Sequence, residues 1–366
     1  MFNNMFFLAR QIEGQPGFIV RPIANIFGFV VNLLFEFVYM IGASHSLGFT
    51  IILMTIIFRA CMMPLSIRAQ KSMARMRELK PELDKIDAKY GKSKDPEIMK
   101  KANQEKQILM QKHDANPLKG CFPMLLQMPL FIGLNFIMRQ AFLYINRLND
   151  IYYELAVAIQ NVPDFEIILH DIVVELLPNN MYNNFRDALP RYQAGESIAY
   201  LKDTIGDFLY AHDPADLSRA ISRFTSEHWA YLQQNIPDAY WTSIDSINQT
   251  RTTIETFFGL SMTEASSLSW PQVILPLLTG LTMICSSWLM QQRTADPNAN
   301  DQQKLQQKIM LFVMPVFMVF ITFGLPAGVA LFWVTSQVFQ VCQDLILNRK
   351  DGIPLNLPFL KKEKTE

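Results

Sequence analysis

Charged residues are scarce in this sequence, and the patterns of several site classes are missing. Asp, Glu, Lys and Arg make up 18% of the 366 residues, against about 25% in ordinary soluble proteins. The four cysteines form no close pair, so neither a disulfide framework nor a zinc site is predicted. The five histidines are scattered singly and no glycine-rich phosphate loop is present. The formal net charge of zero gives no reason to expect DNA as a partner.

Long apolar blocks take up much of the chain. Half of the residues are hydrophobic, and they gather in runs able to cross a hydrocarbon layer about 30 Å thick. Backbone groups in lipid must be hydrogen-bonded within their own segment, so these runs are expected to be helices. The expected fold is an all-α integral membrane protein in a lipid bilayer. Its five predicted spans are residues 47–65, 121–145, 271–290, 309–323 and 327–346.

The segments around the spans differ in composition. Gly324–Gly328 is predicted to join the last two spans as a tight helical hairpin. Within the charged segment, Gly91 is expected to break a helix, and Asp95 to cap the next one, giving a helical hairpin. The long acidic segment is expected to hold a small helical domain, and stretches such as Phe165–Leu177 are amphipathic. The predicted segments are 1–46 (N-terminal), 66–120 (basic hairpin), 146–270 (acidic), 291–308 (loop) and 347–366 (basic tail).

Charge differs between the loops and predicts their orientation. Residues 66–119 hold 14 Lys and Arg against 8 Asp and Glu, and residues 146–270 hold 7 against 17. The tail after Leu347 holds 5 basic and 3 acidic residues. Because Lys and Arg stay on the cytoplasmic side, five spans place the hairpin and the tail inside. The N-terminus and the 146–270 segment are then outside.

One apolar segment, Pro22–Gly42, has two interpretations. Asn25, Gly28, Asn32 and Glu36 recur at helical spacing and form one polar stripe. This stripe favours a helix that lies in the membrane interface over one that spans. As a span, it would move the N-terminus to the inside.

Arg59 lies within the first predicted span. An arginine in hydrocarbon costs roughly 2.5–3.5 kcal/mol or more and normally faces water or a partner. Snorkelling toward the cytoplasm is the alternative, but Arg59 precedes Arg68 by nine residues, about 14 Å of helix. Asp344 is placed in the last turn of the fifth span, so no embedded carboxylate is expected to pair with the arginine. The sequence therefore favours a water-filled cavity around Arg59.

Further polar residues lie inside the predicted spans. Each is explained equally well by an interhelical hydrogen bond, worth about 0.6 kcal/mol on average. Taken together they supply enough polarity to line a hydrated groove beside Arg59. These residues are Gln127, Asn135, Ser286, Ser287, Thr335, Ser336 and Gln337.

Several motifs resemble the YidC family of membrane protein insertases, over roughly two thirds of the chain. Arg59 followed by Pro64-Leu65 matches an intramembrane arginine of that family, and the remaining motifs resemble its cytoplasmic hairpin, second span and last hairpin. Those motifs are Lys71–Met76, Leu79–Pro81, Lys89-Tyr90, Asn116–Pro123, Gln127–Pro129, Gly324–Gly328 and Leu331–Trp333.

The resemblance implies a five-helix core around a polar groove that opens to the cytoplasm and the lipid. It implies an insertase of client membrane proteins in the bacterial plasma membrane, acting alone or with the Sec translocon and without nucleotide or metal. The hairpin and the tail would contact a ribosome or targeting receptor. Arg59 becomes the groove arginine, Gln127 a lining residue of the second span, and Trp288 a match in the third span. The 146–270 connection is longer than in short members of the family.

Two other functions remain open on the residues alone. A secondary transporter could use Arg59 to bind a small anion, although no internal repeat is visible and five spans divide poorly into halves. An assembly chaperone without translocation activity would need the same groove. None of these functions makes or breaks a covalent bond, so the protein is not expected to be an enzyme.

Overall fold

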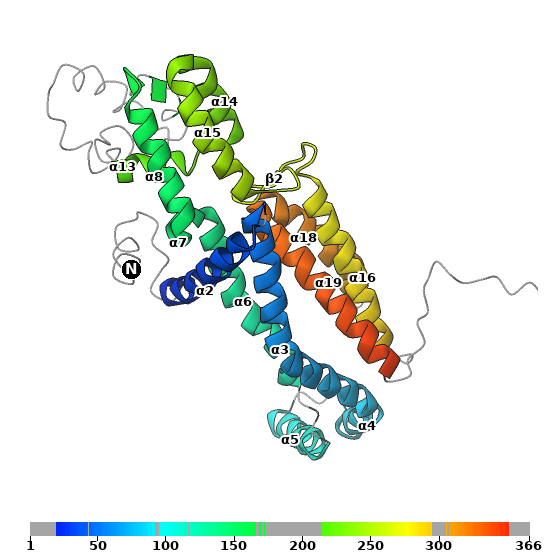
Figure 1. Cartoon of the computed structure of the whole chain (residues 1–366). Coiled ribbons are helices and arrows are strands. Elements are labelled where there is room, and N and C mark those ends of the chain that lie inside the picture. The colour runs from blue at the N-terminus through cyan, green and yellow to red at the C-terminus, as the bar shows by residue number, and fades with distance from the viewer. Residues whose placement is uncertain are drawn as a thin grey trace, which may run out of the picture. The chain divides into compact units, whose positions relative to one another are not determined.

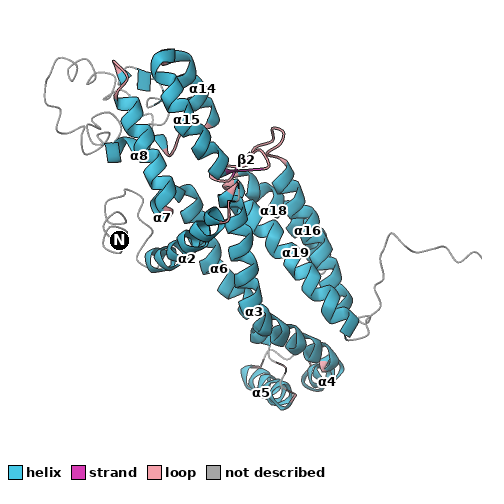
Figure 2. Cartoon of the chain, viewed as in Figure 1, coloured by secondary structure: helices cyan, strands magenta, loops and turns pink. Residues whose placement is uncertain are grey.

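The computed structural model contains two compact units, described separately below. The first unit comprises residues 1–50 and 136–264, and the second comprises residues 51–135 and 265–366. Most described residues are helical, as predicted (Figure 2). Expectations for 1–19, most of Phe165–Leu177, most of the 291–308 loop and residues 351–366 lie outside the described residues. The structure describes residues 20–42, 44–91, 95–113, 115, 117–165, 168–169, 172, 214–294, 305 and 308–350.

The second unit contains most of the apolar helical segments. Within the described residues, three stretches are long and apolar enough to cross a membrane, namely Ser46–Ser72, Ile274–Gln291 and Ala327–Lys350. Ile309–Phe323 is a shorter apolar stretch. The helices are α3 (Ser46–Glu78), α4 (Lys80–Tyr90), α5 (Pro96–Lys112), α6 (Pro117–Arg139), α16 (Ile274–Thr294), the π-helix η1 (Ile309–Val313), α18 (Met314–Phe323) and α19 (Ala327–Lys350).

Helices α16, α18 and α19 lie side by side in this unit (Figure 1). A glycine allows the backbone of α16 to approach α18, because a Cβ atom at Gly280 would lie 2.5 Å from Cγ2 of Val319. The predicted turn between the last two apolar segments is confirmed, since α18 ends at Phe323 and α19 begins at Ala327. Gly324 donates its backbone N–H to the carbonyl of Ile321 at 3.1 Å within this turn.

The charged hairpin consists of two consecutive helices, α4 and α5, that pack on each other. Gly91 ends α4 at a positive φ of 62°, and the Asp95 carboxylate accepts from the backbone N–H of Glu97 at 3.0 Å. Both features match the prediction for the turn. Lys89 bridges the helices by pairing with Glu105 at 3.0 Å. This pair is exposed to solvent, so it contributes little to stability.

Three apolar helices end elsewhere than the hydropathy pattern predicted. Helix α3 continues past residue 65 to Glu78, and α19 continues past residue 346 to Lys350. Helix α6 ends at Arg139, six residues before the predicted end, because Gln140 leaves the helical region with φ −136° and ψ 41°. Hydropathy marks where charge begins, whereas polar residues with high helix propensity can continue a helix beyond that point.

The first unit holds the long acidic segment and begins with α2. The described part of residues 146–270 is mostly helical. A two-stranded antiparallel hairpin, β1–β2, was not predicted; its turn has positive φ at Phe258 and Gly259. The elements are α2 (Val20–Met40), α7 (Ala141–Tyr144), α8 (Asn146–Gln160), α13 (Pro214–Ile221), α14 (Ser226–Asn235), α15 (Asp238–Glu255), β1 (Thr256–Phe257) and β2 (Leu260–Ser261).

The polar stripe of α2 contacts protein. The Asn32 side-chain oxygen accepts from the backbone N–H of Asn146 at 3.0 Å, and Glu36 pairs with Arg147 at 3.2 Å. Arg147 also lies 4.1 Å from the ring centre of Tyr39. The stripe is therefore used to attach α2 to the start of α8. The other side of α2 is exposed and apolar, with Ile26, Phe29, Leu33, Phe37 and Met40.

Candidate functional site

The Arg59 side chain is hydrogen-bonded to a neighbouring helix of the second unit. It lies on α3, and its Nε donates to the Oγ of Ser336 on α19 at 3.1 Å. Ser336 is fully buried and Arg59 is partly exposed. This contact directs the Nε of Arg59 toward α19. Among the described residues, Ser336 is the hydrogen-bond partner of the Arg59 side chain.

A second polar contact lies next to the first on α19. The Oγ of Ser286 on α16 donates to the Oε1 of Gln337 at 2.9 Å. Because Ser336 and Gln337 are adjacent, α19 contacts α3 through one residue and α16 through the next. Arg59, Ser286, Ser336 and Gln337 therefore form a polar cluster among three apolar helices.

Helix α6 presents its predicted polar residues toward the same part of α19. Phe131 stacks on Trp333 with ring centres 4.9 Å apart, and Trp333 precedes Ser336 by three residues. Gln127 and Asn135 lie four residues before and after Phe131, so all three share one face of α6. Gln127 is partly buried, and its Nε2 has no acceptor in the described part of the chain. That donor needs water or a ligand as its partner.

Trp288 is not brought into this cluster. It is half-buried on α16 and follows Ser286 by two residues, which places it about 200° round the helix. Ser286 faces Gln337, so Trp288 faces another direction. Of the residues that the sequence analysis named for the groove, Arg59, Ser286, Ser336 and Gln337 lie in the polar cluster. Gln127 and Asn135 lie on the face of α6 beside it.

The sequence analysis missed a buried polar seam between α3 and α19. Asp344 is 1% exposed, and its Oδ1 accepts from Nε2 of Gln70 at 2.9 Å and from Nε2 of Gln340 at 3.0 Å. Gln343 donates to the Oγ of Ser66 on α3 at 3.1 Å. The sequence analysis placed Asp344 in the last turn of the fifth predicted span, and helix α19 itself continues for six residues beyond Asp344.

A sequence signal for this seam was present. Gln340, Gln343 and Asp344 lie within one turn of each other, and Ser66 and Gln70 are four residues apart on another helix. Two polar faces at such spacing on neighbouring apolar helices indicate that they pair. The seam places a carboxylate two helical turns beyond Ser336, about 12 Å along α19.

Comparison with known proteins decides the family. The family model described as "60Kd inner membrane protein" matches residues 39–178 and 229–352, more than half of the chain. The chain belongs to this family. It is the family of the YidC membrane protein insertases, so the resemblance drawn from the motifs is confirmed. Membership makes the chain a bacterial membrane protein insertase of mostly helical structure.

Individual YidC relatives align with this chain over different lengths. Insertase YidC of Oceanobacillus iheyensis is 27% identical over 302 residues, 82% of this chain and 74% of that protein. YidC 1 of Listeria monocytogenes is 23% identical over 327 residues, 89% of this chain and 69% of that protein. Insertase MisCA of Bacillus subtilis is 39% identical over 116 residues, which is 32% of this chain and 41% of MisCA.

The YidC family model leaves one stretch of the acidic segment unmatched. The match continues to residue 178 and resumes at residue 229, so the unmatched stretch is 179–228. The sequence analysis expected the connection 146–270 to be longer than the corresponding connection in short members of the family. The helices α8 and α15 lie wholly inside the matched ranges, whereas α13 lies in the unmatched stretch.

Proposed function

We propose that this insertase moves hydrophobic segments of client membrane proteins from the cytoplasm into the bilayer through a polar groove centred on Arg59. The observation that carries the proposal is the Arg59–Ser336 contact, which fixes a guanidinium beside buried polar groups on helices otherwise apolar enough to span. Gln127, Asn135 and Gln337 would line the same groove, with Trp288 at a different face of α16.

The groove would act by electrostatics and hydration. A fixed positive charge attracts acidic segments of a client. Hydrating such a segment partway across the bilayer divides its desolvation cost into smaller steps. The client's apolar helix then enters lipid because burial of its surface is favourable. No covalent bond changes in this process, so the groove needs no catalytic residue.

The proposed orientation rests on loop charge. Helices α3, α6, α16, η1 with α18, and α19 would be the five spans. The basic α4–α5 hairpin and the tail would lie in the cytoplasm, and residues 146–270 outside. On this arrangement the hairpin and tail are the surfaces for a ribosome, a targeting receptor or the Sec translocon.

We further propose that α2 lies in the outer interface of the membrane. Its exposed face is apolar, with Leu33 60% and Met40 82% exposed. Its polar stripe is occupied by Asn146 and Arg147 of the same unit. A helix whose polar side is attached to an extracytoplasmic domain can cover that domain's membrane-facing side with its apolar side.

Client topology after substitution at Arg59 tests the groove. Cells depleted of the native protein would express wild type or Arg59→Ala with single-span clients whose outer tails are acidic or neutral. Protease protection of the tails measures insertion. We expect Arg59→Ala to reduce insertion of acidic tails about tenfold or more, and that of neutral tails much less.

Arg68→Ala is the matched control, because it removes an exposed arginine from the same helix. It should leave both clients unaffected. Equal loss for the two clients with Arg59→Ala would contradict an electrostatic role. Unchanged client topology on depletion would instead favour an assembly chaperone without insertion activity.

A further inference from the structure

The first unit contains a cavity of about 280 Å³ between α14, α15 and the strand hairpin. Its walls include two indole rings, three carboxylates and one guanidinium. Three carboxylates against one guanidinium give the lining a net charge of −2. These side chains are Trp229, Trp241, Asp245, Arg251, Glu255 and Glu264.

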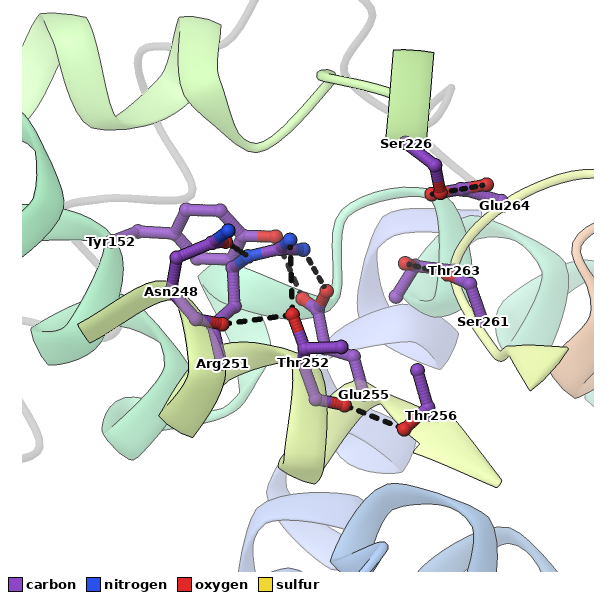
Figure 3. Close-up of polar contacts among 10 residues, drawn as sticks. All are labelled: Tyr152, Ser226, Asn248, Arg251, Thr252, Glu255, Thr256, Ser261, Thr263 and Glu264. Carbon is purple, nitrogen blue, oxygen red and sulfur yellow. Dashed lines mark hydrogen bonds and ion pairs between the residues drawn. The ribbon is translucent and has the colours of Figure 1, made fainter. Parts of the chain in front are cut away.

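The guanidinium in this cavity is already satisfied by its own neighbours (Figure 3). Arg251 donates from Nη1 to Glu255 at 2.7 Å and from Nε to Asn248 at 2.9 Å. It also lies 4.7 Å from the ring centre of Trp229. Glu255 is balanced in charge by Arg251 and also accepts from the Tyr152 hydroxyl at 2.7 Å. The buried pair therefore carries no net charge of its own.

The two remaining carboxylates keep capacity to accept hydrogen bonds. Glu264 accepts from the Ser226 hydroxyl at 3.1 Å, and Asp245 accepts from the side chain of Gln249 at 2.7 Å. A carboxylate has about four acceptor positions, so each retains positions for further donors. Both side chains are partly exposed to the cavity's solvent. The cavity thus offers acceptors and negative charge.

The aromatic wall supplies the other half of the recognition. An indole face attracts an ammonium or guanidinium group within about 6 Å of the ring centre, and Arg251 shows this arrangement with Trp229 inside the same cavity. Trp229 is 6% exposed, and its Nε1–H has no acceptor among the described residues.

We propose that this cavity binds a primary ammonium or guanidinium group between Trp241, Asp245 and Glu264. Such a group could belong to a small free amine or to a Lys or Arg side chain of a polypeptide. The cavity volume suits one such group with its aliphatic stem. This binding site goes beyond the insertase function and does not depend on the groove.

Acidity should weaken the binding. Burial raises the pKa of Glu264 above that of an ordinary glutamate, with Ser226, Arg251 and Glu255 as its other close influences. Glu264 therefore loses its charge as the pH falls from neutral, sooner than an exposed glutamate would. Asp245, Glu255 and Arg251 are the remaining charged groups of the lining, and Arg251 stays protonated throughout.

Titration of the full-length protein in lipid nanodiscs tests the site. Nα-acetyl-lysine amide and Nα-acetyl-arginine amide are the probes, and Nα-acetyl-norleucine amide is the uncharged control. Binding is measured by calorimetry and by tryptophan fluorescence. We expect the charged probes to bind, added salt to weaken them, and Glu264→Gln or Asp245→Asn to weaken them at least tenfold.

Matched substitutions on the same helices serve as controls. Glu227→Gln on α14 and Asp238→Asn on α15 make the same chemical changes at exposed positions outside the cavity, and should leave binding unchanged. Equal binding of norleucine amide would overturn the proposal, as would absence of binding to wild type at millimolar probe. Wild-type affinity in both cavity variants would overturn it too.

A second arm distinguishes the source of the cation. Spermidine and free arginine are compared with Lys- or Arg-containing pentapeptides and with their Gln analogues. Tighter binding of the basic pentapeptides assigns the site to a polypeptide, and tighter binding of the free amines assigns it to a small molecule. Either result supports the cation site, whereas equal binding of the Gln peptides contradicts it.

Discussion

The Oδ1 atom of Asp344 on α19 accepts a hydrogen bond from the Nε2 of Gln70 on α3 at 2.9 Å. Gln340 donates to the same oxygen at 3.0 Å, so two amides hold one buried carboxylate. The negative charge lies about 12 Å along α19 from Ser336, the partner of Arg59. It therefore opposes part of the positive potential that Arg59 creates.

Asp344→Asn should strengthen the attraction of acidic client segments. The substitution keeps the side chain's shape and an acceptor oxygen while removing the charge. At an effective dielectric of about 20 and a separation of about 12 Å, the lost interaction is about 1.4 kcal/mol, roughly tenfold in occupancy. Photocrosslinking from Ser287 to acidic and neutral client tails measures it. Glu78→Gln, an exposed change on α3, is the control, and an equal gain for both tails would contradict the charge effect.

The buried Tyr152–Glu255–Arg251 network should stabilise the first unit. Glu255→Ala leaves the Arg251 guanidinium buried at 8% exposure without its charged partner. Breaking a buried pair in this way costs about 3–5 kcal/mol in the free energy of unfolding. Hydrogen exchange of the α15 backbone would report the loss. Asp245→Ala on the same helix removes a partly exposed carboxylate and should cost less than about 1 kcal/mol.

Helix packing at Gly280 should tolerate no larger side chain without a shift of α18. Val319 is β-branched and stiff, so its methyl group cannot easily move from an added Cβ atom at 2.5 Å. Gly280→Ala should destabilise the second unit by about 1–3 kcal/mol, and Gly280→Leu should do so more severely. Gly324→Ala is the comparison, because its Cβ would meet only ordinary contact at 3.7 Å. Thermal unfolding in detergent ranks the three variants; equal midpoints would contradict the close approach.

Stability should depend on pH through Glu264. Burial raises its pKa, so the folded state holds the proton more tightly than the unfolded chain. The stability that protonation contributes is complete below the ordinary glutamate range and is lost as the pH rises through the raised folded pKa. Glu264→Gln stays neutral, so it should equal wild type near about pH 4 and exceed it at pH 8. Thermal unfolding at both values checks this, with Glu227→Gln expected to follow wild type.

Residue types alone predicted several helix ends and turns of the fold. Asp95 caps α5, Gly91 ends α4, and the Gly324–Pro326 turn separates α18 from α19, as expected from residue type alone. Arg59 stood out in the sequence as the charged residue within its predicted span. Its partner Ser336 lies 277 residues away, and such tertiary pairs leave no trace in local spacing.

Other features depended on packing that a single sequence does not encode locally. The stripe on α2 indicated amphipathicity, but only tertiary contact shows that Asn32 and Glu36 meet Asn146 and Arg147. The break at Gln140 was hidden inside a continuous apolar run. The strand hairpin at 256–261 is too short to show an alternating pattern.

Helix α3 links the charged hairpin mechanically to Arg59. It continues from Arg59 to Glu78 without a flexible linker, a distance of about 29 Å at 1.5 Å per residue. Pro64 lies between the two and leaves the Ala60 carbonyl without its usual helical donor. Helix α3 therefore bends most easily at this position. A partner that pulls on the hairpin would therefore bend α3 at Pro64, five residues from Arg59.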